Sequence, residues 1–367
     1  MKKQIQWIDS LKLIAAFAVF WGHFFMTFLG SRPDYDAIQG ATRKIILIWV
    51  HIFNLFKAGD YWVFVFCLIA GYFAARKKIA TFKDLIKAII HRYFRFVIPI
   101  LFTNIFAWII WNTFGYQTQI WKELVGSTWV GEAYAVKLGI VDVFKSAFLL
   151  THQFSGPFWV IRPIFYGSVI VYVYSYIKSK VEETKVLYLP DVIMMILLWM
   201  SFVNQWMYAN LFRTMVLAVG GVLLKYIWDN IIIPKEMVWM PTSFLLITFL
   251  THDIYPTIAA KENSIIAFFF VLSLFYSGIV IKALECDVFK KTSNLSFGIF
   301  ALHGPILFSL GIWIQRMLMK RMPYALSISI NLVVLTFVVL VAAYIFRYVV
   351  EDMIMKRIFS SSLIRRK

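Results

Sequence analysis

The chain has 367 residues, of which 61% are hydrophobic and 15% are charged, and its mean hydropathy is +0.75. A soluble chain carries about a quarter charged residues, so this composition excludes a soluble globular protein and indicates an integral membrane protein. The net charge of +18 comes from Lys and Arg residues that lie between apolar runs. This distribution favours a role in membrane topology over binding to nucleic acid.

Apolar runs long enough to cross about 30 Å of hydrocarbon recur along the chain. We expect an all-α, polytopic bundle that forms a single integral membrane domain over residues 1–367, with no appended soluble domain. The run at 45–56 is shorter, which favours an interfacial or re-entrant helix. The ten expected transmembrane helices are 11–29, 61–75, 94–112, 158–177, 189–207, 211–228, 239–252, 264–282, 295–316 and 325–348.

The basic residues orient this bundle. Segment 76–95 carries seven Lys or Arg residues against one Asp, and the tail 356–367 carries five more. Both are expected in the cytoplasm, and an even number of helices places both termini there. Loop 113–156, whose charges balance, is then external, and the basic cluster 316–321 is an exception to the rule. The expected location is the inner (plasma) membrane of the cell, as a multi-pass protein.

The first apolar helix contains ionisable residues, which are costly in a membrane and mark functional sites. Lys12 and His23 are eleven residues apart, so they share one helix face at a separation of about 16 Å. Lys12 is also compatible with a snorkelling anchor that pairs with Asp9, three residues earlier. His23 is compatible with a hydrogen-bonded structural residue or with a general base, because neutral imidazole can take a proton from a hydroxyl.

Two further clusters contain arginines. Arg92 and Arg95 are three residues apart at the inner edge of the third helix. Two guanidinium groups on one face suit the capture of phosphates, and equally suit a positive-inside anchor. Arg162 begins the fourth helix, where it can contact a lipid headgroup, a substrate or another helix.

The ninth helix carries Ser296 and His303, which are seven residues apart and therefore on one face. Pro305 follows and predicts a kink, because proline removes a backbone donor. His303 is compatible with a satisfied structural group and with a role beside His23, where it would stabilise an oxyanion or orient the base. External aromatic residues fit either sugar stacking or an interfacial belt; they are Trp111, Trp121, Trp129 and Tyr134.

Four motifs occur in order along the chain: Asp9-x-x-Lys12 with His23, Gly59 to Ala70-Gly71-Tyr72-Phe73, His91-Arg92-x-x-Arg95-x-x-x-Pro99, and Ser296-Phe297-Gly298-Ile299-Phe300-x-x-His303-x-Pro305. They resemble the membrane acyltransferase-3 family, and the resemblance covers nearly the whole chain. Arg162 departs from the pattern, since many relatives carry Glu there; Arg at this place is similar to the branch that contains sugar O-acetyltransferases. Ala70 replaces a small hydroxyl residue in the second motif.

The resemblance implies transfer of an acyl group, usually acetyl, from cytoplasmic acyl-CoA to a hydroxyl of a glycan or lipid-linked sugar. It implies that His23 is catalytic and that Arg92, Arg95 and Lys12 hold the acyl-CoA. The supporting residues are then Asp9, Arg162, Ser296 and His303. No metal and no permanently bound cofactor are expected, and the partners are acyl-CoA, the acceptor glycan and membrane lipids.

A different class of protein fits the same residues. A transporter or flippase that exports a glycan would use Lys12, Arg162 and His303 to line a polar path, with His23 relaying protons. The two hypotheses differ on acetyl-CoA, which the enzyme binds and the transporter does not. Within the enzyme hypothesis, the sequence is compatible with acetyl, succinyl or another acyl group and with several classes of acceptor.

Overall fold

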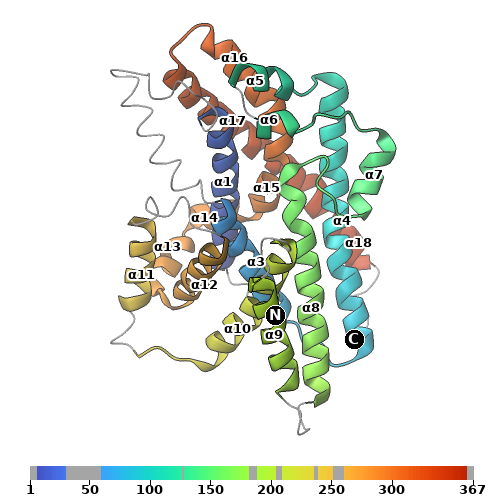
Figure 1. The fold of residues 1–367 in the computed structure, drawn as a ribbon, viewed down its shortest axis with the longest axis vertical. Helices are drawn as coiled ribbons and strands as arrows, with labels where there is room; N and C mark the ends of the chain where they lie inside the picture. The colour runs from blue at the N-terminus through green and yellow to red at the C-terminus, as the bar shows by residue number, and fades with distance from the viewer. Residues whose placement is uncertain are drawn as a thin grey trace. The chain divides into compact units, whose positions relative to one another are not determined.

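A computed structural model describes residues 6–29, 59–125, 128–181, 188–203, 209–234, 239–250 and 260–361. Within these ranges the chain is helical and contains no strand (Figure 1). The expected run at 45–56 lies outside the described residues. The main helices are α1 (Gln6–Phe28), α3 (Gly59–Ala75), α4 (Phe82–Thr113), α8 (Ile161–Val181), α9 (Leu189–Val203), α10 (Ala209–Asn230), α11 (Trp239–Leu250), α12 (Ala260–Tyr276), α13 (Gly278–Leu284), α15 (Ser296–Ile306), α16 (Ile312–Met319) and α17 (Tyr324–Phe346).

Among the described residues, six helices are long and apolar enough to cross a membrane, or seven if a bent pair counts as one span. The bent pair is the expected helix 264–282, which divides into α12 and α13 at an angle of 87°. The all-α, multi-pass class is therefore confirmed. The count of ten helices and the cytoplasmic position of the termini remain predictions, as does the single domain.

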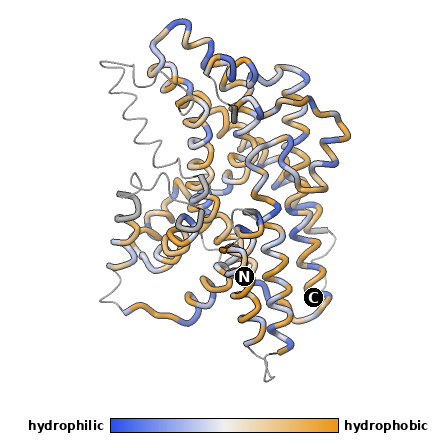
Figure 2. Tube along the Cα trace, viewed as in Figure 1, coloured by the Kyte–Doolittle hydropathy of each residue, from blue (hydrophilic) through white to orange (hydrophobic). Residues whose placement is uncertain are grey.

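Large apolar side chains on the outside of the helices support the membrane assignment. On α9, Trp199 is 67% exposed, and on α17, Phe337 is 68% exposed. Figure 2 shows that hydrophobic residues run along most of α9. Side chains of this kind on a helix surface face lipid in a membrane protein, because water would disfavour them.

The chain divides into two compact units. Unit 1 comprises Met1–Ala15, Ala58–Phe96 and Trp159–Lys291, and unit 2 comprises Ala16–Lys57, Val97–Phe158 and Thr292–Lys367. Helices α1 and α4 each contribute residues to both units.

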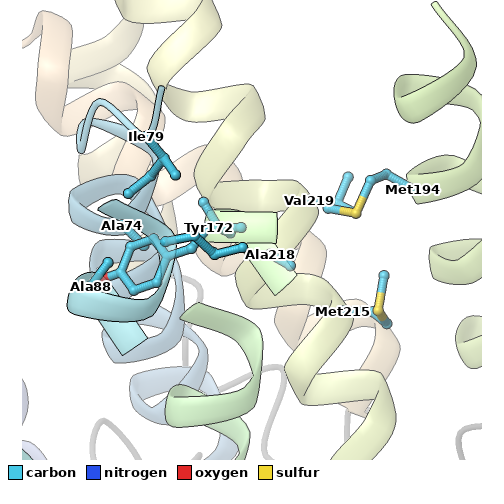
Figure 3. Close-up of a cluster of buried hydrophobic side chains, with 10 residues drawn as sticks. Ala74, Ile79, Ala88, Tyr172, Met194, Met215, Ala218 and Val219 are labelled. Carbon is cyan, nitrogen blue, oxygen red and sulfur yellow. The ribbon is translucent and has the colours of Figure 1, made fainter. Parts of the chain in front are cut away.

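Unit 1 is built around a close crossing of α3 and α10. A Cβ added to Gly221 would lie 2.2 Å from the backbone carbon of Gly71, so only glycine allows this approach. Helix α8 packs against the same pair through Gly167, whose added Cβ would lie 2.6 Å from Leu217. A cluster of buried apolar side chains, including Tyr172, fills the space between these helices and α9 (Figure 3).

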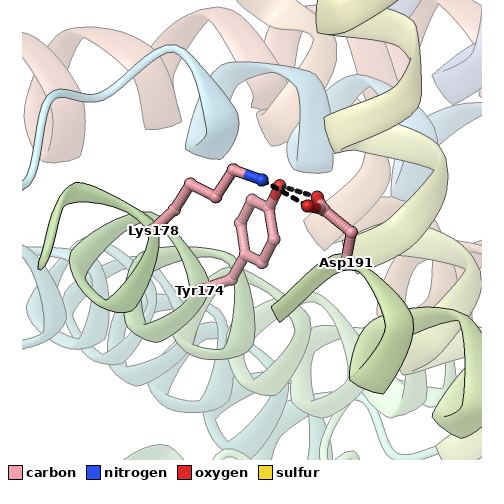
Figure 4. A network of polar contacts seen from close by, with 3 residues as sticks. All are labelled: Tyr174, Lys178 and Asp191. Atoms are coloured by element: carbon pink, nitrogen blue, oxygen red, sulfur yellow. Dashed lines mark hydrogen bonds and ion pairs between the residues drawn. The ribbon is translucent and has the colours of Figure 1, made fainter. Parts of the chain in front are cut away.

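A polar contact joins α8 to the start of α9 within unit 1. Tyr174 donates a hydrogen bond of 2.6 Å to Asp191, and Lys178 forms an ion pair with the same carboxylate (Figure 4). Asp191 lies in the first turn of α9, where a negative charge also favours the helix N-terminus. This contact fixes the hairpin between the two helices.

Unit 2 contains the C-terminal part of α1 together with α15, α16 and α17. The sequence predicts a kink at Pro305, and the structure has a π-helical segment, Leu307–Gly311, that begins two residues after that proline. Because Pro305 has no N–H, the carbonyl of Ala301 loses its helical donor, and the hydroxyl of Ser155 donates to it at 3.1 Å. The interruption of the helix therefore lies just beyond His303.

Candidate active site

His23 lies on the part of α1 that belongs to unit 2, and side-chain hydrogen bonds fix the rotation of this helix. The indole of Trp21 donates to the hydroxyl of Thr336 on α17 at 3.2 Å. The indole of Trp121 donates to the carbonyl of Thr27 at 3.0 Å, and this tryptophan is fully buried. Trp121 therefore supports α1, and its ring is not accessible as a surface for sugar stacking.

The structure brings His23 and His303 together. Nδ1 of His23 lies 2.9 Å from Nε2 of His303, and the ring planes differ by 24°. The ring centroids are 5.2 Å apart, which is longer than the distance between the two nitrogens by about the width of one ring. This difference is expected when each nitrogen lies between the two ring centres. The two imidazoles thus meet edge to edge, as a hydrogen bond in the plane of the rings requires.

The two histidines differ in accessibility. His303 is completely buried, whereas His23 is partly exposed. The rings of Phe20 and Phe300 flank His303, with centroids 5.8 Å and 6.3 Å away. Of this pair, His23 is therefore the member that a substrate can reach, and His303 supports it from an apolar environment.

Ser296 does not reach this pair. It begins α15, and seven residues of helix place it about 10 Å along the axis from His303. Within the described residues there is also no group of three or more His, Cys, Asp or Glu side chains arranged to hold a metal ion. We therefore assign no chemical step to Ser296.

In unit 1, the predicted neighbours Asp9 and Lys12 form an ion pair, with a carboxylate oxygen 2.5 Å from Nζ. The ammonium also lies over the ring of Phe73, 5.5 Å from its centroid. Lys12 therefore has a structural anchor on both sides. Its remaining exposure still allows it to meet a ligand, since 31% of its side chain is accessible.

Arg92 and Arg95 lie on α4 within a cluster of positive charges. Arg92 lies 4.9 Å from the ring centroid of Phe96, and its Nε is buried without a hydrogen-bond partner among the described residues. Arg95 is exposed. Buried polar groups are normally satisfied, so the Nε of Arg92 is an exception among the described residues.

Lys77 belongs to the same cluster, although the sequence did not distinguish it from the other basic residues of the segment. It lies in the loop between α3 and α4. Burial lowers the pKa of Lys77, and the positive charges of Lys87, Arg92 and Arg95 lower it further, whereas the carboxylate of Asp84 raises it. A bound anion would reduce the repulsion between these positive charges, so their arrangement favours the binding of an anion. We call Lys77, Lys87, Arg92 and Arg95 the basic cluster.

The structure also identifies an arginine that sequence reasoning missed. Arg213 lies on α10 inside an apolar span, with its guanidinium 4.5 Å from the ring centroid of Trp159. A charged residue within a membrane helix is itself a signal, and it could have singled out Arg213. Arg162, which the sequence did single out, is exposed at the start of α8.

These features define a class: a multi-pass helical membrane protein in which a partly exposed histidine is hydrogen-bonded to a buried histidine in one unit, and basic residues cluster in the other. The family model described as an acyltransferase domain matches residues 5–349, nearly the whole chain. The chain therefore belongs to the acyltransferase-3 family. No curated protein and no solved structure gives a significant match.

Proposed function

We propose that this acyltransferase is an O-acyltransferase of the inner membrane, which moves an acyl group, acetyl in the first instance, from cytoplasmic acyl-CoA to a sugar hydroxyl. The acceptor is a cell-surface polysaccharide or a lipid-linked glycan. The observation that carries the proposal is the edge-to-edge pair of His23 and His303 in a member of an acyltransferase family. An accessible imidazole held by a second residue is the usual arrangement of a general base.

In this mechanism His23 removes the proton of the acceptor hydroxyl as its oxygen attacks the thioester carbon. The new C–O bond forms and the C–S bond breaks. The proton held by His23 then passes to the sulfur of the departing CoA. The reaction is therefore balanced without any other reactant, and His23 returns to its neutral state.

The basic cluster supports the donor side of the proposal. Coenzyme A carries several negative phosphate charges, and charge-assisted hydrogen bonds from Arg and Lys are the usual means of holding them. Arg92 offers a buried, unused Nε donor, and Arg95 is exposed on the same helix. Lys12, on α1, is the third donor-binding residue in this proposal.

The direct test is mass spectrometry of surface glycans from cells with and without the chain, together with a His23→Ala variant. Loss of a general base lowers the rate about 10²- to 10⁴-fold, so His23→Ala should abolish detectable acylation. A matched control is His152→Ala, since His152 is an exposed histidine outside the pair. Full acyl transfer by His23→Ala would overturn the mechanism.

Donor binding is tested by titrating the purified protein with acetyl-CoA. The double variant Arg92→Glu/Arg95→Glu should bind at least about tenfold more weakly, because attraction of the phosphates becomes repulsion. Lys83→Glu is the control, since it reverses an exposed charge in the first turn of the same helix. Equal binding by the double variant and the control would contradict the assignment.

The same measurements separate the enzyme from the transporter or flippase. A transporter would move the glycan unmodified and would show no binding of acetyl-CoA. Acetyl-CoA binding that depends on Arg92 and Arg95, together with acylation that depends on His23, is expected only from the acyltransferase.

A further inference from the structure

The hydrogen bonds around the histidine pair determine where its protons lie. Nδ1 of His303 is 3.0 Å from the carbonyl oxygen of Ile299. A carbonyl can only accept, so this nitrogen carries a proton and donates. A neutral imidazole has one N–H, and Nε2 of His303 therefore presents a lone pair.

The hydrogen bond to His303 also determines the tautomer of His23. Its Nδ1 lies 2.9 Å from Nε2 of His303, which is an acceptor, so Nδ1 of His23 donates. In neutral His23 the remaining lone pair then lies on Nε2. The order of donation is His23 to His303 to the backbone of α15.

The alternative order requires a positive charge on His303, with Nδ1 of His23 accepting from it. His303 is completely buried between Phe20 and Phe300, and no carboxylate in the described part of the chain bonds to it. A charge in such surroundings is strongly disfavoured without an opposite charge. The neutral pair is therefore the ground state.

We propose that His303 is a positioning residue that holds His23 in the Nδ1–H tautomer, so that Nε2 of His23 is the atom that takes the proton of the acceptor hydroxyl. This inference rests on the proposed acyl transfer. When Nε2 gains the proton, Nδ1 continues to donate to neutral His303, which stabilises the imidazolium while the C–O bond forms and the C–S bond breaks.

The assignment also excludes one role for His303. Its single N–H is directed at Ile299 and its lone pair accepts from His23, so neither nitrogen is left to donate to an oxyanion. The sequence alone allowed either an orienting or an oxyanion-stabilising role for this residue. The geometry supports the orienting role.

The tautomer is tested directly by magic-angle-spinning NMR of membranes that contain the protein labelled with ¹⁵N-histidine. Comparison with His23→Ala assigns the His23 signals. We expect a protonated Nδ1 and an unprotonated Nε2 in the wild type, and loss of this preference in His303→Leu. A His23 proton on Nε2 in the wild type would overturn the proposal whatever the activity.

The functional test compares two replacements of His303. Glutamine can accept from His23 through its carbonyl and donate to Ile299 through its amide, whereas leucine can do neither. His303→Leu should lower kcat by about 10²- to 10⁴-fold with unchanged acetyl-CoA binding, because an unoriented base reacts poorly. His303→Gln should recover most of this loss.

Retained acetyl-CoA binding shows that a variant is folded. If His303→Leu and His303→Gln both bind acetyl-CoA and lose kcat equally, the positioning role is wrong. It is also wrong if His303→Leu keeps the full kcat. A wild-type protein that shows the expected tautomer but transfers no acyl group would count against the proposed function and leave the tautomer assignment standing.

Discussion

At the scale of single residues, the basic side chains of unit 1 differ in what holds them in place. Lys12 has an anionic partner in Asp9 and an aromatic one in Phe73. Lys77 lies over the ring of Tyr172, 5.5 Å from its centroid, and among other positive charges. The partners of Lys12 stabilise its positive charge without a ligand, whereas we expect a bound anion to stabilise the positive charge of Lys77. Lys77 is therefore the residue whose protonation should respond to the donor.

This difference predicts a pH dependence of donor binding. Burial and nearby cations lower the pKa of Lys77 from its ordinary value of 10.5 in the free protein, and bound phosphates raise it again. At a pH between the pKa of Lys77 in the free protein and its pKa in the complex, binding of acetyl-CoA takes up a proton. Affinity should therefore fall as the pH rises from the lower of these pKa values to the higher. Calorimetry in buffers of different ionisation enthalpy measures the uptake. Lys77→Met should remove the uptake, while Lys78→Met, at an exposed neighbour, should not.

The sequence predicted the individual ionisable residues of the site better than their contacts. His23 could be singled out because an ionisable group in an apolar helix is costly. Its contact with His303 joins residues 280 positions apart, which no local pattern indicates. The protonation of the pair depends in turn on the carbonyl of Ile299, a backbone group that has no signature in the sequence.

At the scale of helices, apolar length predicted the elements, and their interruptions needed the structure. The expected helix 264–282 divides at Ser277, whose hydroxyl lies 2.7 Å from that of Thr242. Gly278 was the only local sign of this bend, and glycine alone does not specify an angle. Likewise, Pro305 predicted a deviation in the ninth helix, whereas nothing in the sequence indicated that the segment Leu307–Gly311 would be π-helical.

The crossing of α3 and α10 predicts a large effect from a small substitution. Alanine at Gly221 gains about 0.5–1 kcal/mol of intrinsic helix stability. Its Cβ would lie 2.2 Å from backbone atoms of Gly71, which no side-chain rotation relieves, so the helices must separate. Overpacking costs about 1–3 kcal/mol and should dominate. The thermal unfolding midpoint in detergent, followed by tryptophan fluorescence, should therefore fall.

Gly278→Ala is the matched control for that substitution. In the described structure no atom outside its chain neighbourhood lies within 4 Å of a Cβ added there, and Gly278 begins α13. We expect an unchanged or slightly higher midpoint, because only the helix preference of alanine acts. A Gly221→Ala protein as stable as Gly278→Ala would show that the two helices tolerate a wider crossing.

At the scale of the whole molecule, the short apolar helices decide the membrane side of the loops that follow. Helix α3 has 17 residues and α9 has 15, at or below the length that spans a bilayer, which is about 17–25 residues. If either helix did not cross, the next loops would change sides relative to the ten-helix prediction. Helix length alone therefore does not determine on which side of the membrane the loops lie. The charge of the loops indicates the side, and the basic segment 76–95 favours the cytoplasm.

The chain carries its own probe of this topology. Cys286 is exposed between α13 and α14 (Asp287–Thr292), and Cys67 is buried. The ten-helix arrangement places Cys286 in the cytoplasm and loop 113–156 outside. A membrane-impermeant maleimide should therefore label Lys137→Cys, at an exposed position of that loop, in intact cells, and Cys286 only in inverted vesicles. A Cys286→Ser background isolates the first signal. Labelling of Cys286 from outside intact cells would contradict this arrangement. With a cytoplasmic N-terminus, it would mean that an odd number of the helices before Cys286 crosses the membrane. The basic residues would then no longer explain the orientation.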